Sequence, residues 1–126
     1  MSLNHQHPGS LLAEHRFVCC ICGETAGVIK LIDFGNGFEI DRTGVTGRME
    51  CRIGANDVER LSNAIVLGDV RLLHAHDFEI TPFYCPICDA CYCSAHWQMR
   101  DVFDEEGFQD CIRGTCPKGH ERMLED

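Results

Sequence analysis

The sequence predicts an α+β fold, in which a small β-hairpin or meander and one main helix are joined to a cysteine-rich C-terminal unit. Three observations support this prediction: alternating apolar residues within positions 16–53, a helical apolar pattern that starts near residue 56, and ten cysteines in 126 residues. A short chain with this much cysteine relies on cross-links as well as on its apolar core.

The length of 126 residues fits one domain. Residues 1–12 are mostly polar and include a Pro-Gly pair, so we expect a disordered leader there. The remainder, residues 13–126, is expected to form a single domain with an α+β lobe over 13–80 and a metal-ligand-rich lobe over 81–126.

The first lobe begins with β-type patterns. An apolar run over 28–34 predicts a strand, and Asn36-Gly37 after it is typical of a tight hairpin turn with positive φ at both central residues. Residues 48–53 alternate strictly between charged and apolar side chains. This alternation predicts a strand with Cys51 on its buried face, where a free cysteine acts as a small hydrophobe.

A helix is predicted next, from a cap at Asn56 to a stop at Gly68. Its apolar face would carry Val58, Leu61 and Ile65. Asp69 can cap a short second helix that runs to about His76. Because His74 and His76 would point in nearly opposite directions on a helix, we do not expect them to share a metal ion.

Four pairs of cysteine and histidine residues have the short spacings of metal ligands: Cys19 with Cys22, Cys85 with Cys88, Cys93 with His96, and Cys116 with His120. Such a spacing lets one tight turn bring both donors to the same ion. Structural zinc takes four ligands in a tetrahedron, so these eight residues predict two closed zinc sites with no open position. An all-sulfur site could hold iron, but the two histidines favour zinc.

Metal is preferred over disulfides because the N-terminal residues lack the features of a secretory signal. We therefore expect a cytoplasmic protein, where thiols stay reduced. No apolar run is long enough to span a membrane. With 11 Lys and Arg against 20 Asp and Glu, the net charge of −9 disfavours binding to nucleic acid.

Spacing alone leaves three ways to share eight ligands between two ions. The gap between Cys88 and Cys93 resembles that of RING-like and B-box-like zinc fingers. The resemblance implies a treble-clef-like unit in which alternate pairs share an ion: Cys19, Cys22, Cys93 and His96 at one site, and Cys85, Cys88, Cys116 and His120 at the other. An alternative closes Cys85, Cys88, Cys93 and His96 locally and leaves Cys19, Cys22, Cys116 and His120 for the second ion.

The chain also departs from RING-type fingers. Residues 23–84 separate the first two pairs by far more than that pattern has, and the third pair ends in histidine. Ile21, between the first two ligands, resembles the apolar residue with which RING domains meet a ubiquitin-conjugating enzyme. The C-terminal string from Phe83 to Arg122 resembles the end of small uncharacterised bacterial proteins.

Enzyme patterns do not fit. Cys85-Pro86-Ile87-Cys88 resembles the redox pair of glutaredoxins, but further cysteines follow it where that site needs a helix. The spacing of a zinc deaminase is also absent around His76 and Pro82. We therefore predict no catalytic or cofactor-binding residues.

The expected function is a structural zinc-binding protein that serves as a protein-interaction or adaptor module, with a protein partner. Two alternatives remain. Cys20, Cys91 and Cys111 have no predicted role, so the chain could be a redox- or metal-responsive regulator that uses spare thiols. Zinc fingers also occur in nucleic-acid-associated regulators, although the negative charge opposes that function.

Overall fold

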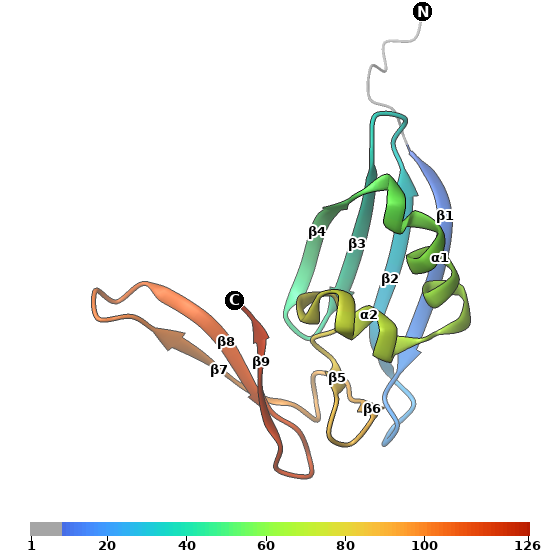
Figure 1. Ribbon diagram of the computed structural model, residues 1–126. Coiled ribbons are helices and arrows are strands. Elements are labelled where there is room, and N and C mark those ends of the chain that lie inside the picture. The colour runs from blue at the N-terminus through green and yellow to red at the C-terminus, as the bar shows by residue number, and fades with distance from the viewer. Residues whose placement is uncertain (1–8) are drawn as a thin grey trace, which may run out of the picture.

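The computed structural model describes residues 9–126 and shows a mostly β protein with three sheets (Figure 1). Within that range, two α-helices and two short 3-10 turns interrupt nine strands. The predicted α+β class with one main helix is therefore wrong. The expected leader falls mainly on residues 1–8, which lie outside the described residues, and residues 10–12 already belong to the first strand.

The largest sheet is an antiparallel meander of four strands in chain order. Its members are β1 (Ser10–Val18), β2 (Thr25–Asp33), β3 (Phe38–Gly44) and β4 (Gly47–Ile53). Cys51 lies opposite Ile40 and packs on the edge of the core, as its alternating strand predicted. Alternation thus predicted β4 and its inward face, and the apolar run over 28–34 predicted β2.

The β2–β3 turn differs from its predicted form. Positive φ occurs at Gly35, with a value of 86°, and not at the Asn36-Gly37 pair. The Phe34 N–H donates to the Gly37 carbonyl at 2.9 Å, and the Asp33 side chain accepts a hydrogen bond from the Gly35 N–H at 2.8 Å. The hairpin is where the sequence predicted it, but the Asp33 side chain shifts the turn to a longer loop.

Two helices cover one face of the large sheet (Figure 1). A 3-10 turn over Ala55–Asp57 leads into α1 (Val58–Leu67), which Gly68 ends with a φ of 69°. The predicted cap at Asn56 is wrong, because the 3-10 turn takes up that residue. Asp69 does cap α2 (Val70–His76) by accepting from the Leu72 N–H.

The main core lies between these helices and the sheet. Ile29, Leu31 and Ile40 supply the sheet side, and Leu61, Ile65 and Leu73 supply the helix side, all fully buried. Arg42 is also fully buried on this face. The opposite face of the sheet carries charged side chains such as Glu14, Lys30, Asp41 and Arg48. No helix among residues 9–126 covers it (Figure 1).

The C-terminal part follows a second 3-10 turn, Phe78–Ile80. A two-residue pair, β5 (Tyr84–Cys85) with β6 (Ala90–Cys91), precedes an antiparallel sheet of β7 (Gln98–Phe103), β8 (Gln109–Thr115) and β9 (Glu121–Glu125). Residues 81–126 contain no helix, so the expected treble-clef-like unit is wrong. Residues 98–125 are mostly polar, so apolar alternation did not predict these strands.

Gly27 lets the two parts of the molecule pack together. A Cβ at this position would lie 2.3 Å from the Phe83 ring and 2.9 Å from the Thr43 carbonyl. We expect Gly27→Ala to lower the free energy of unfolding by about 2 to 3 kcal/mol, because Phe83 must move out of the core. Chemical denaturation measures this loss. Gly54→Ala, whose Cβ would meet nothing within 4 Å, is the control and should leave stability nearly unchanged.

Candidate metal centres

The first cluster joins the turn after β1 to the turn after β6. It contains Cys19 and Cys22 from the former and Cys93 and His96 from the latter. The Sγ atoms of Cys22 and Cys93 are 3.7 Å apart. The Nδ1 atom of His96 lies 3.2 Å from the Cys93 sulfur, 3.6 Å from that of Cys19 and 3.9 Å from that of Cys22.

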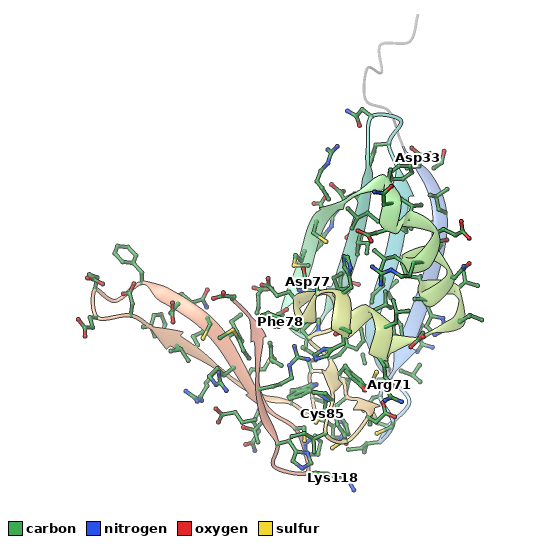
Figure 2. All side chains as sticks on the ribbon, viewed as in Figure 1. Asp33, Arg71, Asp77, Phe78, Cys85 and Lys118 are labelled. Atoms are coloured by element: carbon green, nitrogen blue, oxygen red, sulfur yellow. The ribbon has the colours of Figure 1, made fainter. Side chains whose placement is uncertain are left out.

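The second cluster joins the β5–β6 turn to the β8–β9 turn, where Cys85 and Lys118 mark the two segments in Figure 2. Its donors are Cys85, Cys88, Cys116 and His120. The Sγ atoms of Cys88 and Cys116 are 3.8 Å apart. The Nδ1 atom of His120 lies 3.2 Å, 3.5 Å and 3.7 Å from the sulfurs of Cys88, Cys116 and Cys85.

These distances suit a tetrahedral metal ion. Metal–sulfur bonds of about 2.3 Å give a sulfur–sulfur edge of about 3.8 Å in a tetrahedron. The observed sulfur pairs are 3.7 and 3.8 Å apart, and the four donor atoms of each cluster lie within 4.8 Å of one another. Two Cys3His clusters in this protein could therefore bind metal ions.

The structure groups the eight predicted ligands by alternate pairs. Cys93 and His96 lie with Cys19 and Cys22, and the second pair lies with the fourth. This is the arrangement that the resemblance to RING-like fingers implied, although the treble-clef fold of that resemblance is absent. The local grouping of Cys85 and Cys88 with the third pair does not occur.

Three of the four knuckles, the short segments that each carry one ligand pair, turn tightly around a residue in a left-handed conformation. Gly23 follows Cys22 with a φ of 78°, Asp89 follows Cys88 with a φ of 53°, and Gly119 precedes His120 with a φ of 91°. These turns aim backbone N–H groups at the sulfurs: the Cys88 N–H donates to Cys85 Sγ at 3.4 Å, and the His120 N–H donates to Cys116 Sγ at 3.4 Å. Such donors stabilise thiolates.

In each cluster, one cysteine thiol has a pKa below its usual value of 9.0. Burial opposes the charge on Cys19, but hydrogen bonds from backbone N–H groups of its own knuckle and of Cys93 outweigh it and lower the pKa of Cys19 to about 6. At Cys116 burial again opposes ionisation, while backbone groups of the β8–β9 turn and the Cys88 and Cys85 thiols lower the pKa to about 7. Burial raises the pKa of Cys85 to about 11.

A layer of buried apolar side chains packs against the two clusters. Tyr92, Trp97 and Leu124 are buried among the cluster cysteines. The Trp97 ring meets Tyr92 edge-on with 6.1 Å between ring centroids, and its Nε1 donates to the Phe83 carbonyl at 3.3 Å. Trp97 is therefore a buried residue that packs over the sites.

The histidines and cysteines outside the clusters have other surroundings. His74 Nδ1 lies 3.0 Å from the Thr81 hydroxyl, while His76 Nδ1 lies 3.2 Å from Arg60, so the two imidazoles do not share a site. Cys20 is exposed, and its N–H donates to the Cys91 carbonyl at 3.0 Å. Cys111 is buried in β8.

Sequence reasoning missed two arginines that hold the site region in place. Arg122 donates to the carbonyls of Phe78, Thr81 and Tyr84 at 2.6 to 3.1 Å, and burial lowers its pKa to about 10. Arg42 donates to the Glu79 carbonyl through two nitrogens. Both appear in the sequence as ordinary strand charges, so no pattern marks them as buried.

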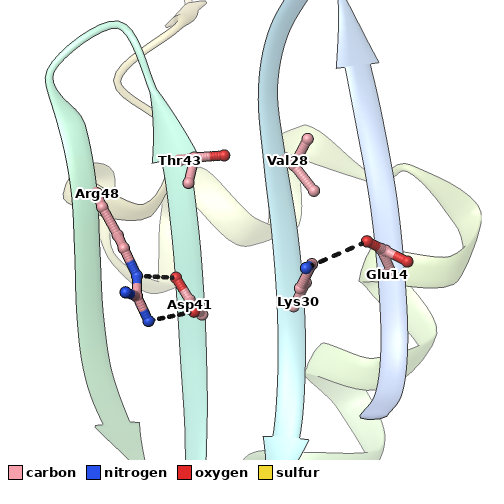
Figure 3. Close-up of a pocket in the computed structure, with 6 residues that line it drawn as sticks. All are labelled: Glu14, Val28, Lys30, Asp41, Thr43 and Arg48. Carbon is pink, nitrogen blue, oxygen red and sulfur yellow. Dashed lines mark hydrogen bonds and ion pairs between the residues drawn. The ribbon is translucent and has the colours of Figure 1, made fainter.

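A groove of about 460 Å³ on the open face of the large sheet is unrelated to the clusters (Figure 3). Its charges compensate one another: Lys30 lies 3.7 Å from Glu14, and Arg48 lies 2.9 Å from Asp41.

Glu39 on the same sheet face provides a pH test. Burial, followed by its hydrogen bond and charge interaction with Glu50, raises the pKa of Glu39 above its usual 4.5. The ionised Glu39 carboxylate therefore lowers the stability of the fold at neutral pH. Below pH 4.5 this carboxyl group is protonated in both the folded and the unfolded chain, so the loss of stability disappears. We expect Glu39→Gln to raise Tm by about 1 to 2 °C at pH 7 and not at acid pH, in thermal scans across pH. Glu105→Gln, on an exposed turn, should leave Tm unchanged.

Within the described range, no helix is both long and apolar enough to cross a membrane. Comparisons with curated proteins and with solved structures gave no significant match. A family described as a domain of unknown function, DUF8328, matches residues 11–126, which include both clusters and all three sheets. The chain therefore belongs to the DUF8328 family.

Proposed function

We propose that this protein binds two structural zinc ions and serves as a protein-interaction or adaptor module. The observation that carries the proposal is the completeness of each cluster: three cysteines and one histidine supply all four corners of a tetrahedron. A catalytic zinc site keeps one position for water or substrate, whereas a structural site is closed by protein.

The donor set favours zinc over other metals. Zinc accepts thiolate and imidazole together in a tetrahedron without a redox change. Three thiolates and one divalent ion leave each site with a net charge of about −1, which does not suit activation of an anionic substrate.

A structural role follows from where the clusters lie. The sulfurs of Cys22 and Cys93 come from segments 71 positions apart, and those of Cys88 and Cys116 from segments 28 positions apart. Metal ions there would close long loops in a region whose strands bury few apolar side chains. Binding free energy then becomes folding free energy.

The interaction role is supported by apolar residues exposed on the knuckles. Ile21 lies between Cys19 and Cys22 and is 53% exposed, and Ile87 lies between Cys85 and Cys88 and is 69% exposed. Large aliphatic side chains held rigidly on the surface contribute to contacts with other proteins.

Metal analysis of the purified full chain tests the proposal. We expect two zinc ions per chain in native mass spectrometry. X-ray absorption should show three sulfurs at about 2.3 Å and one nitrogen at about 2.0 Å around each ion. Iron in place of zinc, or a coordinated water oxygen, would contradict a closed structural zinc site.

A further inference from the structure

Strand β7 has an open edge. It pairs with β8 on one side, and in the sheet order β7-β8-β9 no described strand lies on its other side. Five of its six residues are exposed and Val102 is half-buried. An open edge of this length, about 20 Å, presents backbone N–H and C=O groups that can pair with another chain.

A groove beside this strand can receive side chains. It has a volume of about 310 Å³ and lies between the β7–β8 sheet and the β3–β4 turn. Its apolar lining comes from Val45, Met99 and Ile112, and Met99 is 40% exposed. A segment that adds to the edge of β7 would place alternate side chains next to this lining.

The tip of the β7–β8 hairpin adds two aromatic residues. Phe103 ends β7 and is 60% exposed, while Phe108 precedes β8 and is 70% exposed. The turn between them is ordered: Asp104 Oδ1 accepts from the N–H groups of Glu106 and Phe108 at 3.0 and 2.9 Å. The hairpin points away from the large sheet (Figure 1), so both rings are available to a partner.

The charge of the hairpin indicates the kind of partner. Positions 101–110 contain five carboxylates and no lysine or arginine: Asp101, Asp104, Glu105, Glu106 and Asp110. None of them takes part in the ion pairs found among residues 9–126. The other open edge with many charges, β4, differs because Arg48 already pairs with Asp41 and Glu50.

We infer that the β7 edge binds an extended segment of another protein in which basic residues alternate with apolar ones. The segment pairs with β7 through its backbone, places apolar side chains against Met99 and the two phenylalanines, and sets its lysines or arginines beside the acidic tip. This inference deepens the proposed adaptor function and rests on it.

A synthetic peptide tests the inference. A blocked peptide of alternating lysine and valine, nine residues long, is titrated into the zinc-loaded full chain and followed by amide chemical shifts. We expect saturable shifts confined to β7, the hairpin tip and the β3–β4 turn. The same peptide with every backbone nitrogen methylated keeps its charge but has no N–H group on either edge to pair with a strand, and it should bind about tenfold more weakly.

Variants assign the contributions of the hairpin. Phe108→Ala and Glu105→Lys are each expected to weaken binding about five- to tenfold, through lost aromatic contact and lost charge attraction respectively. Leu67→Ala and Glu59→Lys, on exposed positions of α1, are the matched controls and should not change it.

Two outcomes overturn the inference: equal binding of the methylated peptide, which would mean attraction by charge alone, and shifts located on the open face of the large sheet. Zinc content measured on the same samples separates the two proposals. Two bound ions without peptide binding would overturn the β7 inference only, whereas a metal-free folded chain would overturn the proposed zinc function.

Discussion

Replacing Cys85 with serine is expected to remove one of the two proposed zinc ions and to unfold the three-stranded sheet. Cys85 is buried, and its cluster joins the β5–β6 turn to the β8–β9 turn. Without the ion, two of the remaining donors, Cys88 and Cys116, would be thiols or thiolates held 3.8 Å apart with no cation between them. The apparent binding free energy of structural zinc, about 10 kcal/mol or more, then no longer supports the fold.

Hydrogen exchange with native mass spectrometry checks this result. Amides of β7, β8 and β9 should lose protection, while those of β2 and β3 keep theirs, because the main core lies under the other sheet. Cys20→Ser is the control: Cys20 is exposed beside a predicted ligand but belongs to neither cluster. Two ions and full protection in Cys85→Ser would show that this cluster does not hold metal.

The second large effect is expected at Arg42. Its side chain is fully buried and donates to the carbonyls of Glu79 and Gly47 and to the Thr46 hydroxyl, and it lies 3.3 Å from a carboxylate oxygen of Glu125. Arg42→Ala removes all these donors and leaves a void in the core. We expect a loss of about 3 to 5 kcal/mol in the free energy of unfolding.

Denaturant titrations measure this loss of stability. Two further variants test whether it comes from the buried guanidinium group. Arg42→Lys keeps the charge but not the planar fork, so it should recover only part of the stability. Arg48→Ala, on the neighbouring strand, removes an exposed ion pair and should cost less than about 1 kcal/mol. Equal costs for Arg42→Ala and Arg48→Ala would contradict a structural role for the buried guanidinium.

The parts of the fold that follow short-range rules were predictable. Strict alternation predicted the buried face of β4, and Asp69 predicted the start of α2. The turn after β2 was predicted in place but not in form, because the side chain of Asp33 supplies a hydrogen bond that dipeptide preference does not include.

The C-terminal sheet was not predictable in the same way. Burial in β8 and β9 falls on few residues, such as Cys111, Gly114 and Leu124, which do not form an apolar period. Arg122 is held by carbonyls that become available only when residues 78–84 fold beside β9. The prediction of an α+β fold was wrong because these strands depend on such long-range contacts.

The ligand spacings identified the eight residues that the structure gathers, because tight turns are local. Their grouping into two clusters was not fixed by spacing, which allowed three arrangements. The folded chain resolves the grouping by placing the turn after β1 beside the turn after β6, where the Cys20 N–H bonds the Cys91 carbonyl.

The most direct test of the central claim is the metal content of two double variants in native mass spectrometry. In Cys22→Ser/Cys93→Ser both changes fall in one cluster, so the chain should keep one zinc ion. In Cys22→Ser/Cys88→Ser the changes fall in different clusters, so both ions should be lost. Two ions retained in either variant, or the same metal content in both variants, would contradict the account of two separate Cys3His zinc sites.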